Sequence, residues 1–187
     1  MDKVRVQRDL VYDPGSGLRL DAYAPPRSGR YPVVVLLHGG VPDDVPVRPK
    51  DWGLYRSWGK LLAASGFATV IPNQRISFPD PRLVRQSEPH RQHLSPAQLD
   101  QFSPLVQMER SGPRMAPVFV ARAGNDEVPT LRSALDQFVS SALAHDAPLQ
   151  LVNVPGIEHG FEIDDDPRVR ETLRSLLRFL AEHLERR

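Results

Sequence analysis

Three short stretches of the sequence carry residue types that could do chemistry on a carbonyl group. The first is His38-Gly39-Gly40, where two glycines let the backbone turn sharply and present N–H donors to an oxyanion. The second, at 124–129, contains Asp126, which could orient a histidine and stabilise its charged form. The third, at 156–161, places His159 in a predicted loop, where it could act as a general base.

Each stretch also has a simpler interpretation. Gly39 and Gly40 fit a plain turn from strand to loop, Asp126 fits a cap for the helix that follows it, and His159 fits an exposed loop histidine. The three together are more specific, because each follows a predicted strand and their order is oxyanion loop, acid, histidine. In parallel α/β sheets, ligands bind at the carboxyl ends of the strands.

The elements predicted around the first stretch form a parallel βαβ unit. A continuous apolar run at 33–37 is typical of a strand buried on both faces, and it leads directly into the oxyanion-type turn. Helical spacing over 52–65 follows, with Asp51 as the expected cap and Gly66 as the stop. A second apolar run at 67–71 completes the strand, helix, strand order.

Other elements flank this unit. Alternating residues at 4–12 and 18–24, around turn formers at 13–17, predict an antiparallel pair at the edge of the sheet. Later elements are a strand at 118–121, a helix over 131–143, a strand at 149–154 and a C-terminal helix that begins at Asp166-Pro167.

The interval 76–116 has no sustained period and contains several prolines, so we predict an irregular, proline-rich segment there. One short helix is expected within it, starting at Ser95-Pro96 and ending before Pro104. A loop of this length is uncommon in a compact domain unless it is functional or elements are missing.

The composition indicates one globular domain, 1–187, in the cytoplasm. Hydrophobic residues make up 40% of the chain and charged residues 25%, and the net charge of +1 provides no field to attract nucleic acid. There is no cysteine, no stretch like a signal peptide, and no apolar run long enough to span a membrane. His90 and His93 could mimic a metal pair but lack helical spacing and acidic neighbours, so we expect no metal site.

In this order, the motifs resemble those of the α/β-hydrolase superfamily, specifically its dienelactone-hydrolase-like and small carboxylesterase branch. The resemblance covers nearly all of residues 1–75 and 117–187, and 102–105 resembles the stretch just before the acid-bearing strand. It implies an α/β fold: a mostly parallel sheet flanked by helices in a three-layer sandwich, with an antiparallel N-terminal edge.

The same resemblance implies roles for individual residues. Gly39 and Gly40 would belong to the oxyanion loop, Asp126 would be the acid of a catalytic triad, and His159 would be its base. It also implies that the protein needs no cofactor and that its substrates are small carboxylic esters or lactones.

The sequence departs from this pattern at the nucleophile. The superfamily carries its serine in G-x-S-x-G between a strand and a helix, and no serine here has that context. Ser16 stands between glycines but in an early turn, while Ser77 and Ser103 remain as unsupported candidates. The interval between the strands at 67–71 and 118–121 holds at most one βαβ unit of roughly 30 residues, which indicates that the elbow region is missing.

Four expectations follow from this departure. The main one is a hydrolase-lineage protein with impaired or absent activity. The alternative is a non-catalytic binding or scaffold domain, with Leu83, Val84 and Phe102 as a partner surface and self-association allowed. A third reading keeps His159 and Asp126 as a general-base pair acting on water. We also expect the strands at 33–37 and 118–121 to pair directly, since the strand between them is absent.

Overall fold

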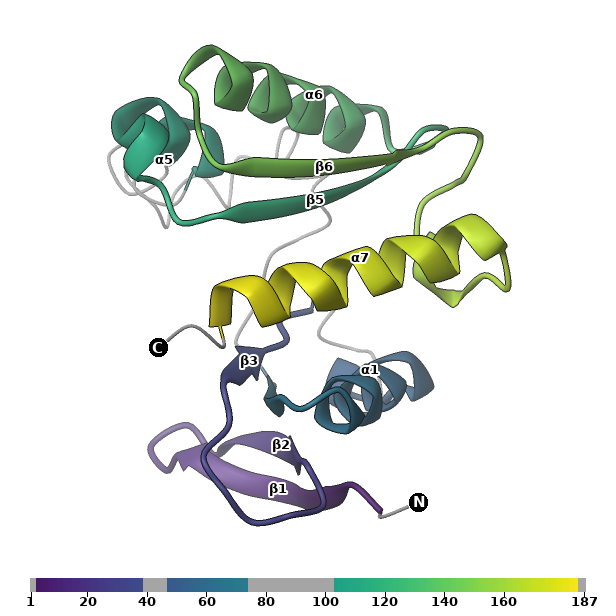
Figure 1. Ribbon diagram of the computed structural model, residues 1–187. Helices are drawn as coiled ribbons and strands as arrows, with labels where there is room; N and C mark the ends of the chain where they lie inside the picture. Colours follow the sequence, from purple (N-terminus) through teal and green to yellow (C-terminus); the bar gives the residue numbers. More distant parts are fainter. Residues whose placement is uncertain (1–2, 39–46, 74–102, 185–187) are drawn as a thin grey trace. The chain divides into compact units, whose positions relative to one another are not determined.

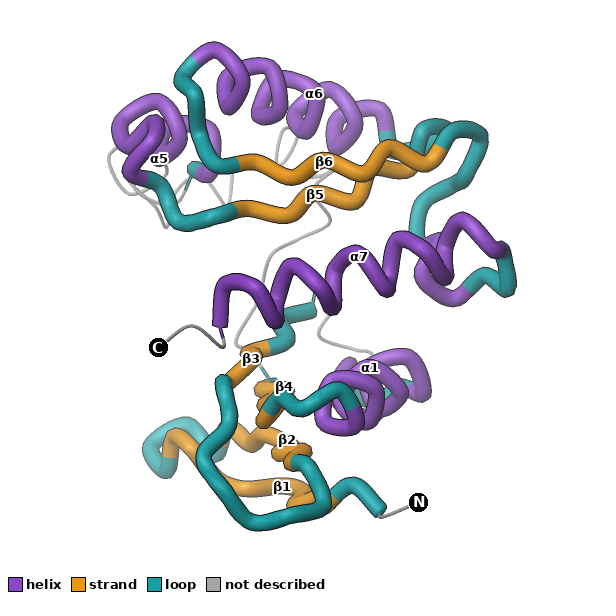
Figure 2. Tube along the Cα trace, viewed as in Figure 1, coloured by secondary structure: helices purple, strands orange, loops and turns teal. Residues whose placement is uncertain are grey.

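The computed structural model describes residues 3–38, 47–73 and 103–184. The chain divides into two compact units, which we call unit 1 (1–86 with 184–187) and unit 2 (87–183). Each unit is described by itself, and the single domain expected from composition stays a prediction. Both units contain helices and strands, as the ribbon and tube views show (Figures 1 and 2).

Unit 1 contains a four-stranded sheet in the order β1-β2-β4-β3. Its strands are β1 (Arg5–Asp13), β2 (Leu18–Ala24), β3 (Val33–Val35) and β4 (Ala68–Pro72). The β1–β2 and β2–β4 pairs are antiparallel, whereas β3 and β4 run parallel. The antiparallel edge and the parallel βαβ pair predicted from the apolar pattern are both confirmed.

Helix α1 (Gly53–Ala64) connects β3 to β4 and ends just before Gly66, the expected stop, whose φ of +100° disfavours any residue with a Cβ atom. The predicted cap, however, is wrong. Trp52 occupies the N-cap position, and Asp51 is the last residue of a short 3-10 helix, η1 (Pro49–Asp51). The carboxylate of Asp51 binds Lys50 and Arg56 instead, which leaves it unavailable to the N–H groups of α1.

The core of unit 1 forms where α1 packs on the sheet. Tyr23, Ala63 and Ile71 are buried there together. Gly59 of α1 lies directly against the ring of Tyr23, since a Cβ atom added at Gly59 would be 2.7 Å from two ring carbons. The helix therefore approaches the sheet more closely at this point than any larger residue would allow.

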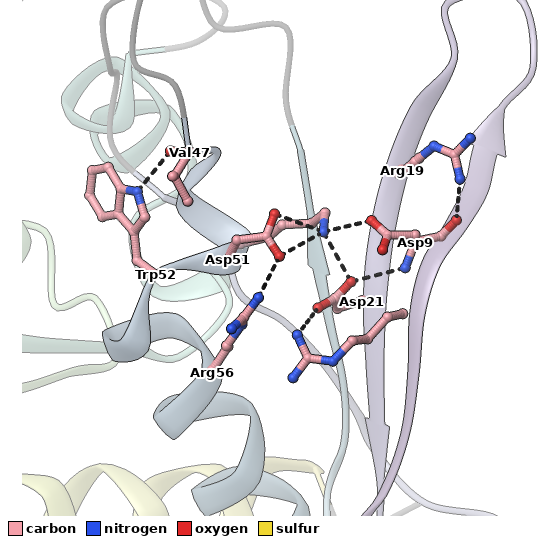
Figure 3. A network of polar contacts seen from close by, with 9 residues as sticks. Asp9, Arg19, Asp21, Val47, Asp51, Trp52 and Arg56 are labelled. Carbon is pink, nitrogen blue, oxygen red and sulfur yellow. Dashed lines mark hydrogen bonds and ion pairs between the residues drawn. The ribbon is translucent and has the colours of Figure 1, made fainter.

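A buried ion-pair network joins η1 to the first two strands (Figure 3). The amine of Lys50, only 2% exposed, lies 2.8 Å from Asp9, 3.3 Å from Asp21 and 3.0 Å from Asp51. Asp21 is fully buried and also lies 3.5 Å from Arg8. A register shift in β1 places Asp9 in the left-handed region, with φ of +57°, and its N–H donates to Asp21.

Unit 2 contains a parallel pair of strands, β5 (Val118–Ala123) and β6 (Leu149–Val154), connected by α6 (Pro129–Ala144). Its other helices are α5 (Pro104–Ser111), the short η2 (Gly112–Arg114) and η3 (Phe161–Ile163), and α7 (Pro167–Leu184). The predicted start of α7 is confirmed, because Asp166 accepts a hydrogen bond from the Arg168 N–H. A core of Met108, Val120, Phe138 and Ala142 joins α5, β5 and α6.

One expectation about the middle of the chain is corrected. Residues 104–114 are helical rather than irregular: the Ser103 hydroxyl accepts from the Val106 N–H, Pro104 follows at the first helical position, and Met108 is fully buried. The expected pairing of the strands at 33–37 and 118–121 stays a prediction, because β3 pairs with β4 in unit 1 and β5 pairs with β6 in unit 2, and each unit is described by itself. The helix predicted from Ser95 lies outside the described residues.

Candidate active site

Asp126 and His159 come together beyond the carboxyl ends of two neighbouring strands in unit 2. Asp126 lies in the loop between β5 and α6, and His159 lies in the loop after β6. Because β5 and β6 run parallel, both loops emerge at the same edge of the strand pair. His159 Nδ1 lies 3.0 Å from Asp126 Oδ2, which is within hydrogen-bond distance.

The two loops are joined by backbone hydrogen bonds that continue beyond the strands. The Gly124 N–H donates to the Val154 carbonyl at 2.8 Å, and the Asn125 N–H donates to the Ile157 carbonyl at 2.9 Å. A Cβ atom at Gly124 would lie 2.9 Å from Pro155 Cα, closer than packed carbon atoms allow. Glycine at this position therefore lets the acid loop lie directly against the histidine loop.

The histidine loop turns at two glycines and rests on an apolar base. Gly156 and Gly160 have φ values of +71° and +76°, a region that favours glycine. Ile157, between them, is buried with Ala123 and Val154 of the two strands. This anchoring leaves His159 at the surface in a defined position, with half of its side chain exposed.

Hydrogen bonds keep Asp126 in its charged form. Its side chain is only 12% exposed, and this burial works against the carboxylate. The hydrogen bonds from His159 and from the Val128 N–H to Asp126 Oδ1 outweigh burial, so the pKa of Asp126 lies below its usual range. At neutral pH the residue is therefore a carboxylate that can orient the imidazole and stabilise it when it takes up a proton.

Sequence reasoning missed a second carboxylate in the same loop. Glu127 Oε2 accepts a hydrogen bond from the His159 backbone N–H at 3.3 Å. Asp126 thus contacts the ring of His159, and Glu127 accepts a hydrogen bond from the backbone N–H of the same residue. Their adjacency in the sequence gave no indication of this contact, since it depends on how closely the two loops pack.

The arrangement can supply a general base. With Nδ1 engaged by Asp126, the histidine ring keeps Nε2 as its other proton-accepting nitrogen. Such a nitrogen can remove a proton from a hydroxyl group or from water that attacks a carbonyl carbon.

The predicted oxyanion residues stay a prediction. Gly39 and Gly40 lie outside the described residues. His38, which precedes them, is 7% exposed and packs edge to face with Tyr55 of α1, with ring centroids 6.0 Å apart. His38 belongs to unit 1 and the Asp126–His159 pair to unit 2, so the structure supports only the acid and the histidine as one site.

Neither of the two described candidate serines, Ser16 and Ser103, has the environment of a nucleophile. Ser103 caps helix α5 rather than ending a strand. Ser16, in the turn between β1 and β2, bonds the side chain of Asp13. Ser77 lies outside the described residues, so its candidacy stays a prediction.

The described residues contain no group of three histidine, aspartate or glutamate side chains arranged to hold a metal ion. His90 and His93 lie outside these residues. Within the described ranges, no helix has the length and apolar character needed to cross a membrane.

Comparison with known proteins gives structural matches only. No family model matches the chain, and no curated protein matches its sequence. The structure resembles a putative dienelactone hydrolase from Klebsiella pneumoniae, with 13% identity, coverage of 98% of this chain and 99% of that one, and a TM-score of 0.56. It also resembles esterase 2 of Thermogutta terrifontis (14% identity, 97% and 95% coverage, TM-score 0.64) and brefeldin A esterase, a bacterial homologue of human hormone-sensitive lipase (14% identity, 100% and 78% coverage, TM-score 0.62).

At these identities, the similarity establishes the fold and not the activity. The chain has the α/β-hydrolase fold, as the order of its motifs predicted.

Proposed function

We propose that this protein is an impaired hydrolase of the carboxylic ester and lactone lineage, in which a general-base pair remains but no serine is presented on a nucleophile elbow. The observation that carries the proposal is the 3.0 Å contact between His159 and Asp126 at the ends of parallel strands. The absence of G-x-S-x-G from the whole sequence supports the loss of the covalent route. Structural likeness to a dienelactone hydrolase and to esterases supports the substrate class.

The chemistry left to such a site is direct hydrolysis by water. His159 Nε2 takes a proton from water as the water oxygen forms a bond to the acyl carbon. The tetrahedral intermediate then collapses, the alkoxide or phenolate leaves, and it recovers the proton from the imidazolium. Asp126 stabilises the imidazolium between the two steps. No acyl-enzyme forms, so the reaction has no burst phase.

p-Nitrophenyl acetate hydrolysis tests this proposal. We expect slow turnover without a burst, reduced about tenfold or more in H159A, since general-base catalysis typically contributes about 10²–10⁴-fold and this base is exposed. D126N should lower the rate in the same direction, because the carboxylate no longer orients the ring. H145A serves as the control: His145 is an exposed histidine at the end of α6, and its loss should leave the rate unchanged.

A fluorophosphonate probe separates this route from a serine route. One structural neighbour, the Thermogutta esterase, is described as phosphorylated by paraoxon, so organophosphate reactivity is a fitting contrast. We expect no labelling of the present chain. Stoichiometric labelling that disappears in H159A, together with a burst of p-nitrophenol, would show that an active nucleophile exists and would overturn the proposal.

A non-catalytic binding or scaffold domain is the second candidate function. The lack of G-x-S-x-G in the sequence favours it, since the Asp126–His159 pair then has no elbow serine to activate. A p-nitrophenyl acetate rate that is identical in wild type and H159A, without probe labelling, would support this candidate over the impaired hydrolase.

A further inference from the structure

The loop that carries His159 depends on outside contacts for its position. It begins at Pro155, directly after β6, and it turns at Gly156 and Gly160, whose φ values of +71° and +76° lie in the left-handed region. Glycine restricts the backbone less than any other residue, so these two turns do not fix the direction of the loop by themselves. The position of His159 therefore depends on the groups that bind the loop.

One set of contacts comes from the loop between β5 and α6. The Asn125 N–H donates to the Ile157 carbonyl at 2.9 Å, and Asp126 Oδ2 lies 3.0 Å from His159 Nδ1. These contacts hold the middle of the histidine loop and the imidazole ring. The ring bond forms only while the two loops stay at this separation, because hydrogen bonds weaken steeply as their geometry is lost.

Arg168 of α7 binds the histidine loop at its first residue. Its Nη1 donates to the Pro155 carbonyl at 2.8 Å. The other side of the guanidinium forms a two-point ion pair with Asp166, with Nε 3.0 Å from Oδ1 and Nη2 2.7 Å from Oδ2. A guanidinium carries its donors in a rigid planar fork, so the pair with Asp166 fixes the direction of the third donor. The start of the histidine loop is thereby connected to the start of α7.

The backbone of Arg168 is also held in place. Its N–H donates to Asp166 Oδ1 at 2.7 Å, and its carbonyl accepts from the Thr172 hydroxyl at 2.9 Å. Hydrogen bonds from the side chain and the N–H of Arg168 lower the pKa of Asp166 to about 2. At neutral pH Asp166 is therefore a carboxylate, and the ion pair that directs Arg168 stays formed.

A second arginine near the start of α7 provides a comparison. The helix dipole disfavours a cation in the first turn of a helix, so an arginine there benefits from a specific anionic partner. Arg170 forms an ion pair with Asp165, which precedes the helix. Arg168 differs because it combines its aspartate partner with a bond to the loop that carries His159.

We propose that Arg168 is a positioning residue for His159. By holding Pro155, it keeps the histidine loop at the separation from the acid loop at which His159 Nδ1 bonds Asp126. A neutral imidazole that donates from Nδ1 keeps Nε2 free to accept a proton. Without Arg168 the loop moves, and the ring spends part of its time in the other tautomer. The catalytic meaning of this inference rests on the proposed function, whereas the tautomer can be measured without catalysis.

Nuclear magnetic resonance tests the inference with the full chain. Proton–nitrogen correlation spectra with isotope-labelled histidine report the tautomer of each neutral ring, and H159A assigns the His159 signals. We expect the Nδ1–H form in wild type and a mixture with the Nε2–H form in R168Q. R168K should resemble R168Q, because lysine keeps the charge but lacks the planar fork. R170Q makes the same change two residues away and should keep the wild-type tautomer.

Kinetics give a second readout. We expect R168Q to lower kcat for p-nitrophenyl acetate by about threefold to tenfold with KM unchanged, since misplacing a catalytic group by about 1 Å can cost about 10²-fold and the loss in H159A sets the limit here. R170Q should keep the wild-type rate. Circular dichroism and thermal unfolding check that each variant is folded.

The two readouts separate this inference from the proposed function. Folded R168Q and R168K proteins with the wild-type tautomer of His159 would overturn the inference, whatever their rates. A hydrolysis rate that is the same in wild type and H159A would contradict the proposed function instead, and the tautomer in R168Q would still decide whether Arg168 positions the ring.

Discussion

Lys50 shows how a single side chain can connect segments that are distant in the sequence. Its buried amine contacts Asp9 of β1, Asp21 of β2 and Asp51 of η1. Burial disfavours the charged amine, but the hydrogen bonds to these carboxylates outweigh it and raise the pKa of Lys50. A fully buried carboxylate such as Asp21 is tolerated only when it is paired, so Lys50 secures the start of α1 against the antiparallel edge.

Replacing this amine should destabilise unit 1. K50M removes the closest cation from Asp21 and leaves only Arg8, at 3.5 Å. Breaking a buried pair by removing one partner costs about 3–5 kcal/mol, and we expect the lower end because Arg8 remains. Urea unfolding measures the change. K60M, at an exposed position of α1, should alter the free energy of unfolding by less than about 0.5 kcal/mol.

Acid should weaken the same network. Burial opposes ionisation of Asp51, but hydrogen bonds from Lys50 and Arg56 outweigh it and depress its pKa. A depressed carboxylate pKa contributes stability that is present above the unfolded-state pKa and is lost as pH falls through the folded-state value. Wild type should therefore lose more stability than K50M below about pH 4. An equal loss in the two proteins would contradict this role for Lys50.

Close packing between elements decides how α1 sits on its sheet. Gly59 lies beneath the ring of Tyr23, and both are buried. Because Gly59 has no side chain, the helix and the strand can approach each other closely at this point. The burial of this face of α1 therefore depends on that one residue. In unit 2, Gly124 has the same effect between two loops, which brings Asp126 within reach of His159.

G59A tests the helix–sheet contact. Alanine favours a helix over glycine by about 1 kcal/mol, but its methyl group would lie 2.7 Å from the Tyr23 ring. Overpacking a core typically costs about 1–3 kcal/mol, so we expect a net loss of stability in thermal or urea unfolding. G53A, where a Cβ atom meets nothing within 4 Å, should be neutral or slightly stabilising. A G59A protein as stable as wild type would show that the ring moves aside freely.

At the scale of the whole chain, each unit has its own apolar core. Tyr23, Ala63 and Ile71 pack within unit 1, while Met108, Val120 and Phe138 pack within unit 2. Within each unit the described strands form one hydrogen-bonded sheet. Each unit therefore draws stability from its own set of contacts.

Hydrogen exchange should distinguish the contacts that stabilise unit 1 from those that stabilise unit 2. We expect K50M to speed amide exchange mainly in β1, β2 and α1, and F138A to speed it mainly in β5, β6 and α6. Truncating a buried phenylalanine costs about 3–5 kcal/mol, which is large enough to detect locally. Mass spectrometry of peptic fragments gives the measurement. If either variant loosened both units to the same extent, the cores would unfold as one cooperative structure.

The sequence by itself predicted the helices and strands named below, and it identified the acid and the histidine of the candidate site. Apolar runs and helical spacing identified β3, α1, β4, β5, α6, β6 and α7, because local periodicity reports which face of each element avoids water. Asp126 and His159 could be selected because each follows a predicted strand, and parallel strands bring their carboxyl ends to one edge.

Only the tertiary structure decided which distant groups meet. The Glu127 contact with His159 and the Lys50 network depend on packing between segments that no local pattern connects. The pairing of β3 with β4 and of β5 with β6 is likewise a long-range choice. Sequence periodicity fixes the direction of a side chain relative to its own element, whereas its partner depends on how whole elements pack in three dimensions.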